Sequence, residues 1–181
     1  MLPNVIFVGP RKTGTTSIYS MLCKNDNVYV NKNVKEIYYF DKFYENGERW
    51  YKKFYINNNE ESIIAEVSPS YFDKEDVIER IYSLLPKAKI VITLRSPVER
   101  TRSDYFHHLR YGYFQNKISE LKDADLENII KPSKYSYYID LWRRRFGGNN
   151  VLILYIDDMR FDEELFYDKI SEFIGEKLNI Y

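Results

Sequence analysis

The sequence has little of several features that would narrow its function at once. Its 181 residues include one cysteine, Cys23, which excludes an intramolecular disulfide and leaves no set of thiols for a zinc site. No run approaches the ~20 consecutive apolar residues of a membrane-spanning helix. The first residues, MLPNV, lead into an apolar strand rather than a signal peptide. We therefore expect a cytoplasmic protein with no membrane partner.

An excess of either charge is also missing. The 27 lysine and arginine residues balance the 27 aspartate and glutamate residues. Without a basic excess, counterion release does not favour bulk nucleic-acid binding, so we expect no nucleic-acid partner. What is present is 44% hydrophobic residues, with 18 tyrosines, spread evenly along the chain. This composition predicts one globular domain over residues 1–181, and nothing in it predicts an oligomeric state.

Short apolar runs alternate with helical patterns. The runs are Val5–Val8, Val28–Val30, Ile63–Ala65, Ile90–Leu94 and Val151–Tyr155, the second being the weakest. Helical periodicity covers 73–86, with Asp73 as a candidate N-cap, and recurs in 166–174. This alternation predicts an α/β fold, a P-loop-type parallel sheet of about four to five strands flanked by helices on both faces. The segments 55–62 and 117–134 read as surface excursions.

Ligands of such sheets bind beyond the carboxyl ends of the strands, where the first candidate motif lies. The run FVGPRKTGTTSIYSML places Gly9 and Gly14 at the spacing of a phosphate-binding loop, before a helix expected over 15–22. The N–H groups of such a turn and of the helix start attract an anion. The lysine usual after the second glycine is replaced by Thr15. Donors lie instead at Arg11, Lys12, Thr13, Thr15 and Thr16.

A second strand end carries further candidate ligands. Arg95 closes the run KIVITLR, and the pattern from Ser96 to Glu99 predicts a capping box with Pro97 in the first helical position. Ser103 lies seven residues after Ser96, hence on nearly the same helical face. The guanidinium of Arg95 and the hydroxyl of Ser103 can therefore converge on one phosphate.

A candidate general base lies in the segment VKEIYYFDK. The aromatic residues at 38–40 would desolvate the Glu36 carboxylate and raise its basicity toward that of a working base. The alternative is a surface glutamate without a role. His107 and His108 are other candidates, but no acidic residue that would orient either ring is evident.

Taken together, these motifs resemble the sulfotransferase family that uses 3′-phosphoadenosine 5′-phosphosulfate (PAPS), in particular the branch acting on heparan sulfate and other carbohydrates. The match runs in order from about Val5 to Gly175 and includes a late segment, Tyr155–Met159, similar to the family's Tyr-Glu-Asp-Leu motif. The resemblance implies that the 5′-phosphosulfate is held by Arg11, Lys12, Thr13, Gly14, Thr15 and Thr16. It also implies that Arg95 and Ser103 hold the 3′-phosphate and that Glu36 is the base.

The resemblance accounts for the unusual loop. A terminal sulfuryl group carries less charge than a phosphate, so we expect no metal, and Lys12 meets the charge on the leaving oxygen. Two departures stand out. Val67 replaces a lysine that carbohydrate members often carry. The sequence ends at EKLNIY, where members usually continue into a basic loop that closes over the nucleotide. Which segment would cover the nucleotide here is left open.

The expected function is sulfuryl transfer from PAPS to a hydroxyl or amine acceptor, a carbohydrate or other small molecule, with 3′-phosphoadenosine 5′-phosphate (PAP) as second product. A P-loop nucleotide kinase is one alternative. The missing lysine after Gly14 and the arginine at 95 count against it, whereas Asp157 and Asp158 keep it open. A non-catalytic nucleotide-binding relative is the other. The tyrosine-rich loops 40–55 and 111–135 do not choose between a sugar and a phenol as acceptor.

Overall fold

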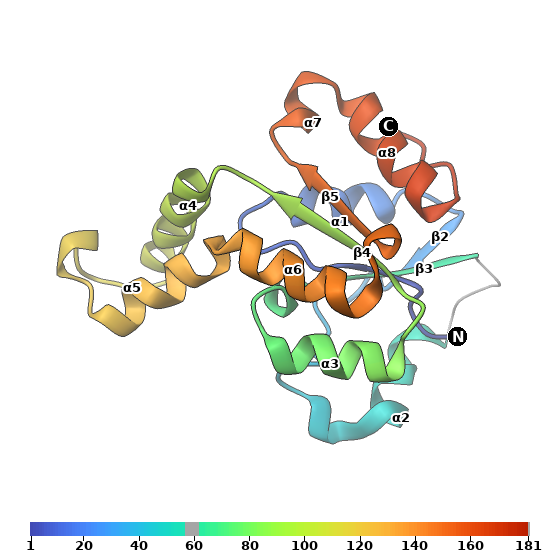
Figure 1. Cartoon of the computed structure of the whole chain (residues 1–181), viewed down its shortest axis with the longest axis horizontal. Helices are drawn as coiled ribbons and strands as arrows, with labels where there is room; N and C mark the ends of the chain where they lie inside the picture. Colours follow the sequence, from blue (N-terminus) through green and yellow to red (C-terminus); the bar gives the residue numbers. More distant parts are fainter. Residues whose placement is uncertain (57–61, 181) are drawn as a thin grey trace.

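The computed structural model describes residues 1–56 and 62–180, and its centre is a parallel sheet (Figure 1). The strand order is β2-β3-β1-β4-β5. The strands are β1 (Val5–Phe7), β2 (Val28–Val30), β3 (Ile63–Val67), β4 (Lys89–Leu94) and β5 (Val151–Tyr155). Each neighbouring pair is parallel, with Val5 opposite Ala65 on one side and Lys89 on the other. The predicted α/β fold is confirmed, and the weakest predicted strand, β2, lies at the edge of the sheet.

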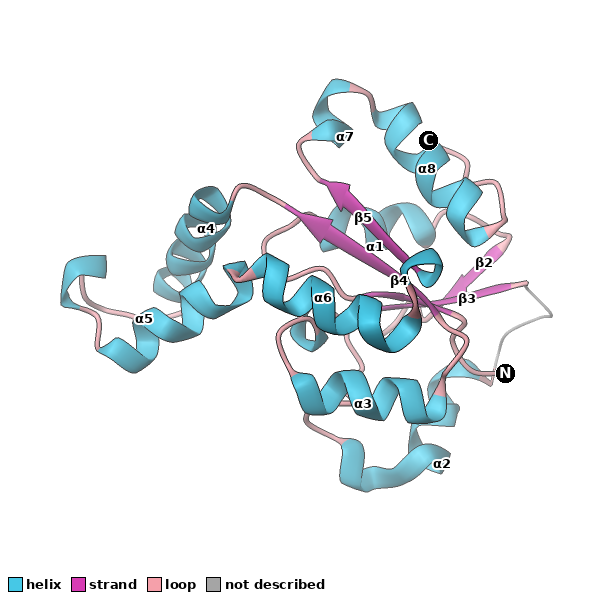
Figure 2. Ribbon diagram, viewed as in Figure 1, coloured by secondary structure: helices cyan, strands magenta, loops and turns pink. Residues whose placement is uncertain are grey.

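Helices cover both faces of this sheet (Figure 2). They are α1 (Thr15–Leu22), α2 (Gly47–Lys52), α3 (Glu75–Leu84), α4 (Pro97–Arg110), α5 (Asp123–Ile130), α6 (Tyr135–Phe146), α7 (Asp158–Phe161) and α8 (Glu163–Ile174). In Figure 1, α1 and α8 lie on one side of the sheet, and α3 and α6 lie on the other. No helix in the described ranges is long and apolar enough to cross a membrane. The cytoplasmic location itself stays a prediction.

The alternation of side chains along β1 builds two cores. Ile6 packs on one face with residues of α3 and α6, whereas Val5 and Phe7 pack on the other face with residues of α1 and α8. Successive strand residues point to opposite faces, which explains why the buried strands read as continuous apolar runs. In the α3/α6 core, the indole N–H of Trp142 donates to the carbonyl of Phe72 at 3.0 Å.

Two predicted caps are wrong in detail. Helix α3 begins at Glu75 with Lys74 in the N-cap position, so Asp73 does not cap it. Ser96 does occupy the N-cap position of α4, ahead of Pro97, but its side chain makes no capping hydrogen bond. The expected partner, Glu99, instead lies 3.7 Å from the guanidinium of Arg95. Glu99 thus pairs with Arg95, and the Ser96 side chain contributes no cap.

Helices α4 and α5 extend away from the sheet beyond the end of β4 (Figure 1). The predicted surface excursion at 117–134 therefore contains a helix, which the acidic sequence KDADLENII concealed. This helix is anchored by Ile129, whose side chain is fully buried and whose carbonyl accepts a hydrogen bond from Arg100. The other predicted excursion, 55–62, lies largely outside the described residues.

Candidate active site

The loop between β1 and α1 packs tightly against the ends of β4 and β5. A Cβ atom at Gly9 would collide with Thr93, and one at Gly14 would collide with the side chain of Ile156. Gly14 also has φ of 82°, a conformation that favours glycine. Helix α1 begins at Thr15, as predicted. The two glycines of the motif are therefore required by close packing and by the turn into the helix.

Lys12 has a left-handed backbone, with φ of 74°. A non-glycine residue in this region is uncommon, because the conformation costs energy. Residues strained in this way cluster at functional sites. Burial lowers the pKa of Lys12; Asp104 opposes this, while Arg110, Arg95 and Lys35 reinforce it. A cation surrounded by other cations and partly desolvated is poised to bind an anion.

Two other side chains of this loop, Arg11 and Thr13, make contacts within the protein. The guanidinium of Arg11 lies 3.2 Å from Asp104 and donates to the carbonyl of Asn128 at 3.3 Å, so it ties the loop to α4 and α5. The hydroxyl of Thr13 is buried, donates to the carbonyl of Pro10 at 2.7 Å and lies 3.0 Å from the Thr93 hydroxyl. Only the backbone of Thr13 is thus left to meet a ligand.

A cavity of about 390 Å³ opens above this loop, and it joins most of the predicted site residues. Its lining comes from the loop and α1, from the segment after β2, from the end of β3 and from α4. The lining residues are Arg11, Lys12, Gly14, Thr15, Thr16, Lys35, Glu36, Tyr38, Pro69, Ser103 and His107. Arg95 is not among them, although it is close enough to affect the pKa of Lys12. The cavity combines several cations with a single carboxylate.

Lys35 is a site residue that sequence reasoning missed. Its ammonium lies 3.4 Å from the Glu36 carboxylate, 3.3 Å from the hydroxyl of Thr16 and 3.5 Å from that of Thr15. It therefore bridges the candidate base and the start of α1. Its position directly before Glu36, in a segment aimed at the same strand edge, was the signal that could have revealed it.

The two histidines of α4 differ in position. His107 lines the cavity, and burial together with the charge of Lys12 lowers its pKa. His108 is packed away, stacked on Phe114 with ring centroids 4.7 Å apart. No acidic residue that would orient either histidine ring is evident from the sequence. In the structure, Nδ1 of His108 hydrogen-bonds with the backbone carbonyl of Asp104 at 2.8 Å, and the Asp104 carboxylate lies 3.7 Å from the same nitrogen. The carboxylate itself pairs with Arg11 at 3.2 Å and with Arg100 at 3.1 Å, so it does not orient the histidine that faces the cavity.

Beneath the segment that carries Glu36 lies a second glutamate, Glu66, with an exposed fraction of 2%. Four hydroxyl groups donate to its carboxylate, those of Tyr51, Tyr55, Ser68 and Tyr71. Tyr71 in turn accepts a hydrogen bond from the backbone N–H of Phe40 at 3.4 Å. This buried cluster therefore supports the segment from Glu36 to Phe40 from below.

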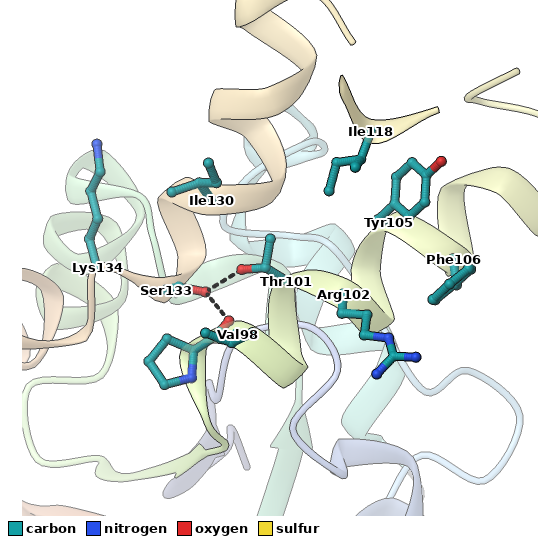
Figure 3. Close-up of a pocket in the computed structure, with 10 residues that line it drawn as sticks. Val98, Thr101, Arg102, Tyr105, Phe106, Ile118, Ile130, Ser133 and Lys134 are labelled. Atoms are coloured by element: carbon teal, nitrogen blue, oxygen red, sulfur yellow. Dashed lines mark hydrogen bonds between the residues drawn. The ribbon is translucent and has the colours of Figure 1, made fainter. Parts of the chain in front are cut away.

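A second cavity, of about 640 Å³, lies between α4, α5 and the turn Ile118–Glu120 (Figure 3). Apolar side chains from α4, α5 and the turn Ile118–Glu120 dominate its lining. Its hydroxyl groups are engaged within the fold, since Thr101 lies 3.0 Å from Ser133, which donates to the carbonyl of Pro97 at 3.4 Å. The larger cavity therefore lacks the converging charges that the smaller one has.

Comparison with known proteins identifies the family and agrees with this fold. The model of the sulfotransferase domain matches residues 2–180, so the chain belongs to the sulfotransferase family. The mouse protein bifunctional heparan sulfate N-deacetylase/N-sulfotransferase 4 is 29% identical over 194 residues, which cover 96% of this chain and 22% of that protein. The family resemblance drawn from the motifs is thus confirmed.

Solved structures share the fold. The sulfotransferase from Alicyclobacillus acidocaldarius superposes with a TM-score of 0.86 at 22% identity, over 99% of this chain and 83% of that one. Mouse sulfotransferase SULT7A1, complexed with PAP, has a TM-score of 0.61 at 16% identity, over 98% and 61% of the two chains.

Proposed function

We propose that the chain transfers a sulfuryl group from PAPS to a hydroxyl or amine of a carbohydrate acceptor. The observation that carries this proposal is the convergence of Lys12, Lys35 and Glu36 on one cavity at the carboxyl edge of the sheet. The chain spans only 22% of the first curated relative, so the acceptor of that protein is a guide rather than a finding for this one. That relative is named as a heparan sulfate N-sulfotransferase, which supports a sugar amine or hydroxyl as the acceptor group here.

The donor set of the cavity fits PAPS. Cations, hydroxyl groups and the start of α1 are the groups that bind phosphate and sulfate oxygens. The 5′ end would be held by Arg11, Lys12, Gly14, Thr15, Thr16 and the backbone of Thr13, and the 3′-phosphate by Arg95 and Ser103. The complex of SULT7A1 with PAP supports this choice of nucleotide. When bound, PAPS supplies an activated sulfuryl group, and its transfer leaves PAP.

The roles of the residues follow from their positions. Glu36 takes the proton of the acceptor hydroxyl or amine, because it is the carboxylate among the side chains that line the cavity. Lys12 and Lys35 stabilise the negative charge that develops as the bond to sulfur breaks. Val67, which stands where the family pattern often has a lysine, is buried in the core, and Lys35 is the second lysine that lines the cavity.

A nucleotide kinase is not favoured, since the family model covers nearly the whole chain and β4 is followed by Arg95 rather than by an acidic residue. Asp157 and Asp158 lie after β5; Asp157 pairs with Arg160 at 3.8 Å, and Asp158 begins α7. A relative that binds nucleotide without turnover is the second candidate, and only an activity assay separates it from the enzyme.

Calorimetric titration with PAP and with ATP, each with magnesium or with EDTA, tests the donor site. We expect PAP to bind in EDTA and more tightly than ATP does. Arg95→Ala should weaken PAP binding about 10- to 100-fold, because it removes a charge-assisted contact worth about 1.5–3 kcal/mol. Arg102→Ala, an exposed arginine on α4, is the matched control. A preference for magnesium-ATP would overturn the proposal.

Turnover is then measured with labelled PAPS and three acceptors: an oligosaccharide with free glucosamine amines, its N-acetylated form and a simple phenol. Transfer to either oligosaccharide in preference to the phenol supports a carbohydrate acceptor. Tight PAP binding without transfer to any of them would favour the non-catalytic relative.

A further inference from the structure

Two non-glycine residues in the described ranges have positive φ, Lys12 at 74° and Tyr38 at 55°. Both line the same cavity. A bulky aromatic residue in the left-handed region is a genuine outlier, and such strain persists only where the surrounding structure enforces it. The proposed function gives Lys12 a task. It gives none to Tyr38, although the same backbone signal marks both.

The chain enforces the conformation at Tyr38 through a tight turn. The carbonyl of Tyr38 accepts hydrogen bonds from the N–H groups of Lys42 at 2.9 Å and Phe43 at 3.0 Å. The flanking side chains of Ile37 and Tyr39 are buried in the core, with exposed fractions of 3% each. The turn therefore leaves Tyr38 as the aromatic residue of this segment that faces the cavity with Glu36.

Charged groups of both signs act on Tyr38. The ammonium of Lys42 lies 4.1 Å from the ring centroid. Burial, followed by the Glu36 carboxylate and then Asp41, raises the pKa of Tyr38 to about 12, while Arg11 acts in the opposite direction. The phenol therefore keeps its proton at neutral pH and can act as a hydrogen-bond donor.

Glu36 needs such a donor. A base works only if its free lone pair is held at the place where the acceptor proton arrives. Lys35 restrains the carboxylate from one side, at 3.4 Å. A long, flexible ammonium that also contacts Thr15 and Thr16 does not by itself define the plane of the carboxylate.

We propose that the hydroxyl of Tyr38 donates to the Glu36 carboxylate and is a positioning residue for this base. The inference rests on the proposed function, because it assigns Tyr38 a part in the same transfer. Lys35 and Tyr38 together leave the remaining lone pairs of Glu36 directed at the acceptor. The strained backbone at residue 38 is then the cost of placing the phenol beside the base.

The contact is tested without turnover, by carbon-13 NMR of protein labelled at the Cζ atoms of tyrosine. The Tyr38 resonance is the one missing from Tyr38→Phe. We expect Glu36→Gln to move this resonance at pH 8, because the hydroxyl loses its charged acceptor. A Tyr38 resonance that stays in place in Glu36→Gln would overturn the inference, whatever the enzyme does.

Kinetics test the role. Tyr38→Phe should lower kcat about 10-fold and leave the KM of the acceptor and the Kd of PAP unchanged, as expected when only the geometry of a base is lost. Tyr39→Phe makes the same chemical change in the core and should have no effect. An increase in KM at constant kcat would overturn the inference, since Tyr38 would then be an acceptor contact. If wild-type protein transfers nothing, the proposed function fails, and the NMR result alone decides the contact.

Discussion

Two glutamates of this chain, one lining the candidate site and one buried and linked through Tyr71 to the segment that carries the first, differ in almost every physical respect. Glu66, on β3, is buried and receives four hydroxyl donors. Glu36, after β2, keeps 22% of its side chain exposed, pairs with Lys35 and opens onto the cavity. The four donors to the Glu66 carboxylate are side chains of the folded chain. The Glu36 carboxylate pairs with the side chain of Lys35, and its remaining oxygen lone pairs are available to a bound acceptor.

The difference shows which property marks a catalytic carboxylate. A buried charge is tolerated when hydrogen bonds saturate it, and saturation leaves no lone pair for chemistry. Glu66 therefore contributes to stability and to the support of the Glu36 segment. Glu36 has a cation on one side and free volume on the other, which is the arrangement that a proton transfer requires. Burial alone would have selected the wrong residue.

The strongest test of this contrast is Glu36→Gln. We expect a loss of sulfuryl transfer of about 10²- to 10⁴-fold, the usual contribution of a general base. Because the side chain is partly exposed and keeps its shape, the free energy of unfolding should change by less than about 0.5 kcal/mol. Transfer rates with saturating PAPS and acceptor, together with urea unfolding, give both numbers. Full turnover with intact PAP binding would assign the base elsewhere, with His107 as the next candidate.

The matching change in the core is Glu66→Gln, which should have the opposite profile. The amide places an N–H₂ group among hydroxyl donors and removes the charge that they solvate, so we expect a loss of about 1–3 kcal/mol in the free energy of unfolding. At a temperature where the variant is folded, PAP should bind as it does to wild-type protein. Unchanged stability would mean that the four hydroxyl groups do not need a carboxylate, and the contrast between the two glutamates would collapse.

The sequence predicted the strands and the helix at 15–22 well, because apolar runs and the glycine spacing are local signals. It also brought Lys12, Glu36 and Ser103 to one edge of the sheet, since parallel strands end together. It did not reveal Lys35, the burial of the Thr13 hydroxyl or the cluster around Glu66. Each of these depends on contacts between side chains of distant segments, such as Thr13 with Thr93. Hydrophobic periodicity identifies helices and strands but does not identify such contacts.

The smallest expected effect concerns alkaline pH and separates the tyrosines of the Glu66 cluster from exposed ones. Burial and the charge of Glu66 raise the pKa of Tyr51, Tyr55 and Tyr71 well above the ordinary value. In the unfolded chain these groups ionise near pH 10, whereas in the folded chain they keep their protons. The folded state thus binds more protons above that pH, so stability is unaffected by this term below about pH 10 and falls as the pH rises further.

Tyr55→Phe removes one of these groups and should reduce the loss of stability between pH 8 and pH 10.5 by less than about 1 kcal/mol, since each such tyrosine contributes at most about 1.4 kcal/mol per pH unit. Urea unfolding at the two pH values measures the difference, and Tyr113→Phe, which removes a tyrosine with an exposed fraction of 73%, is the control. An equal loss in wild type and Tyr55→Phe would show that burial and the charge of Glu66 do not raise the pKa of Tyr55 in the folded chain. The Tyr55 hydroxyl would then ionise in the folded chain as readily as in the unfolded chain, and the buried cluster would not distinguish it from an exposed tyrosine.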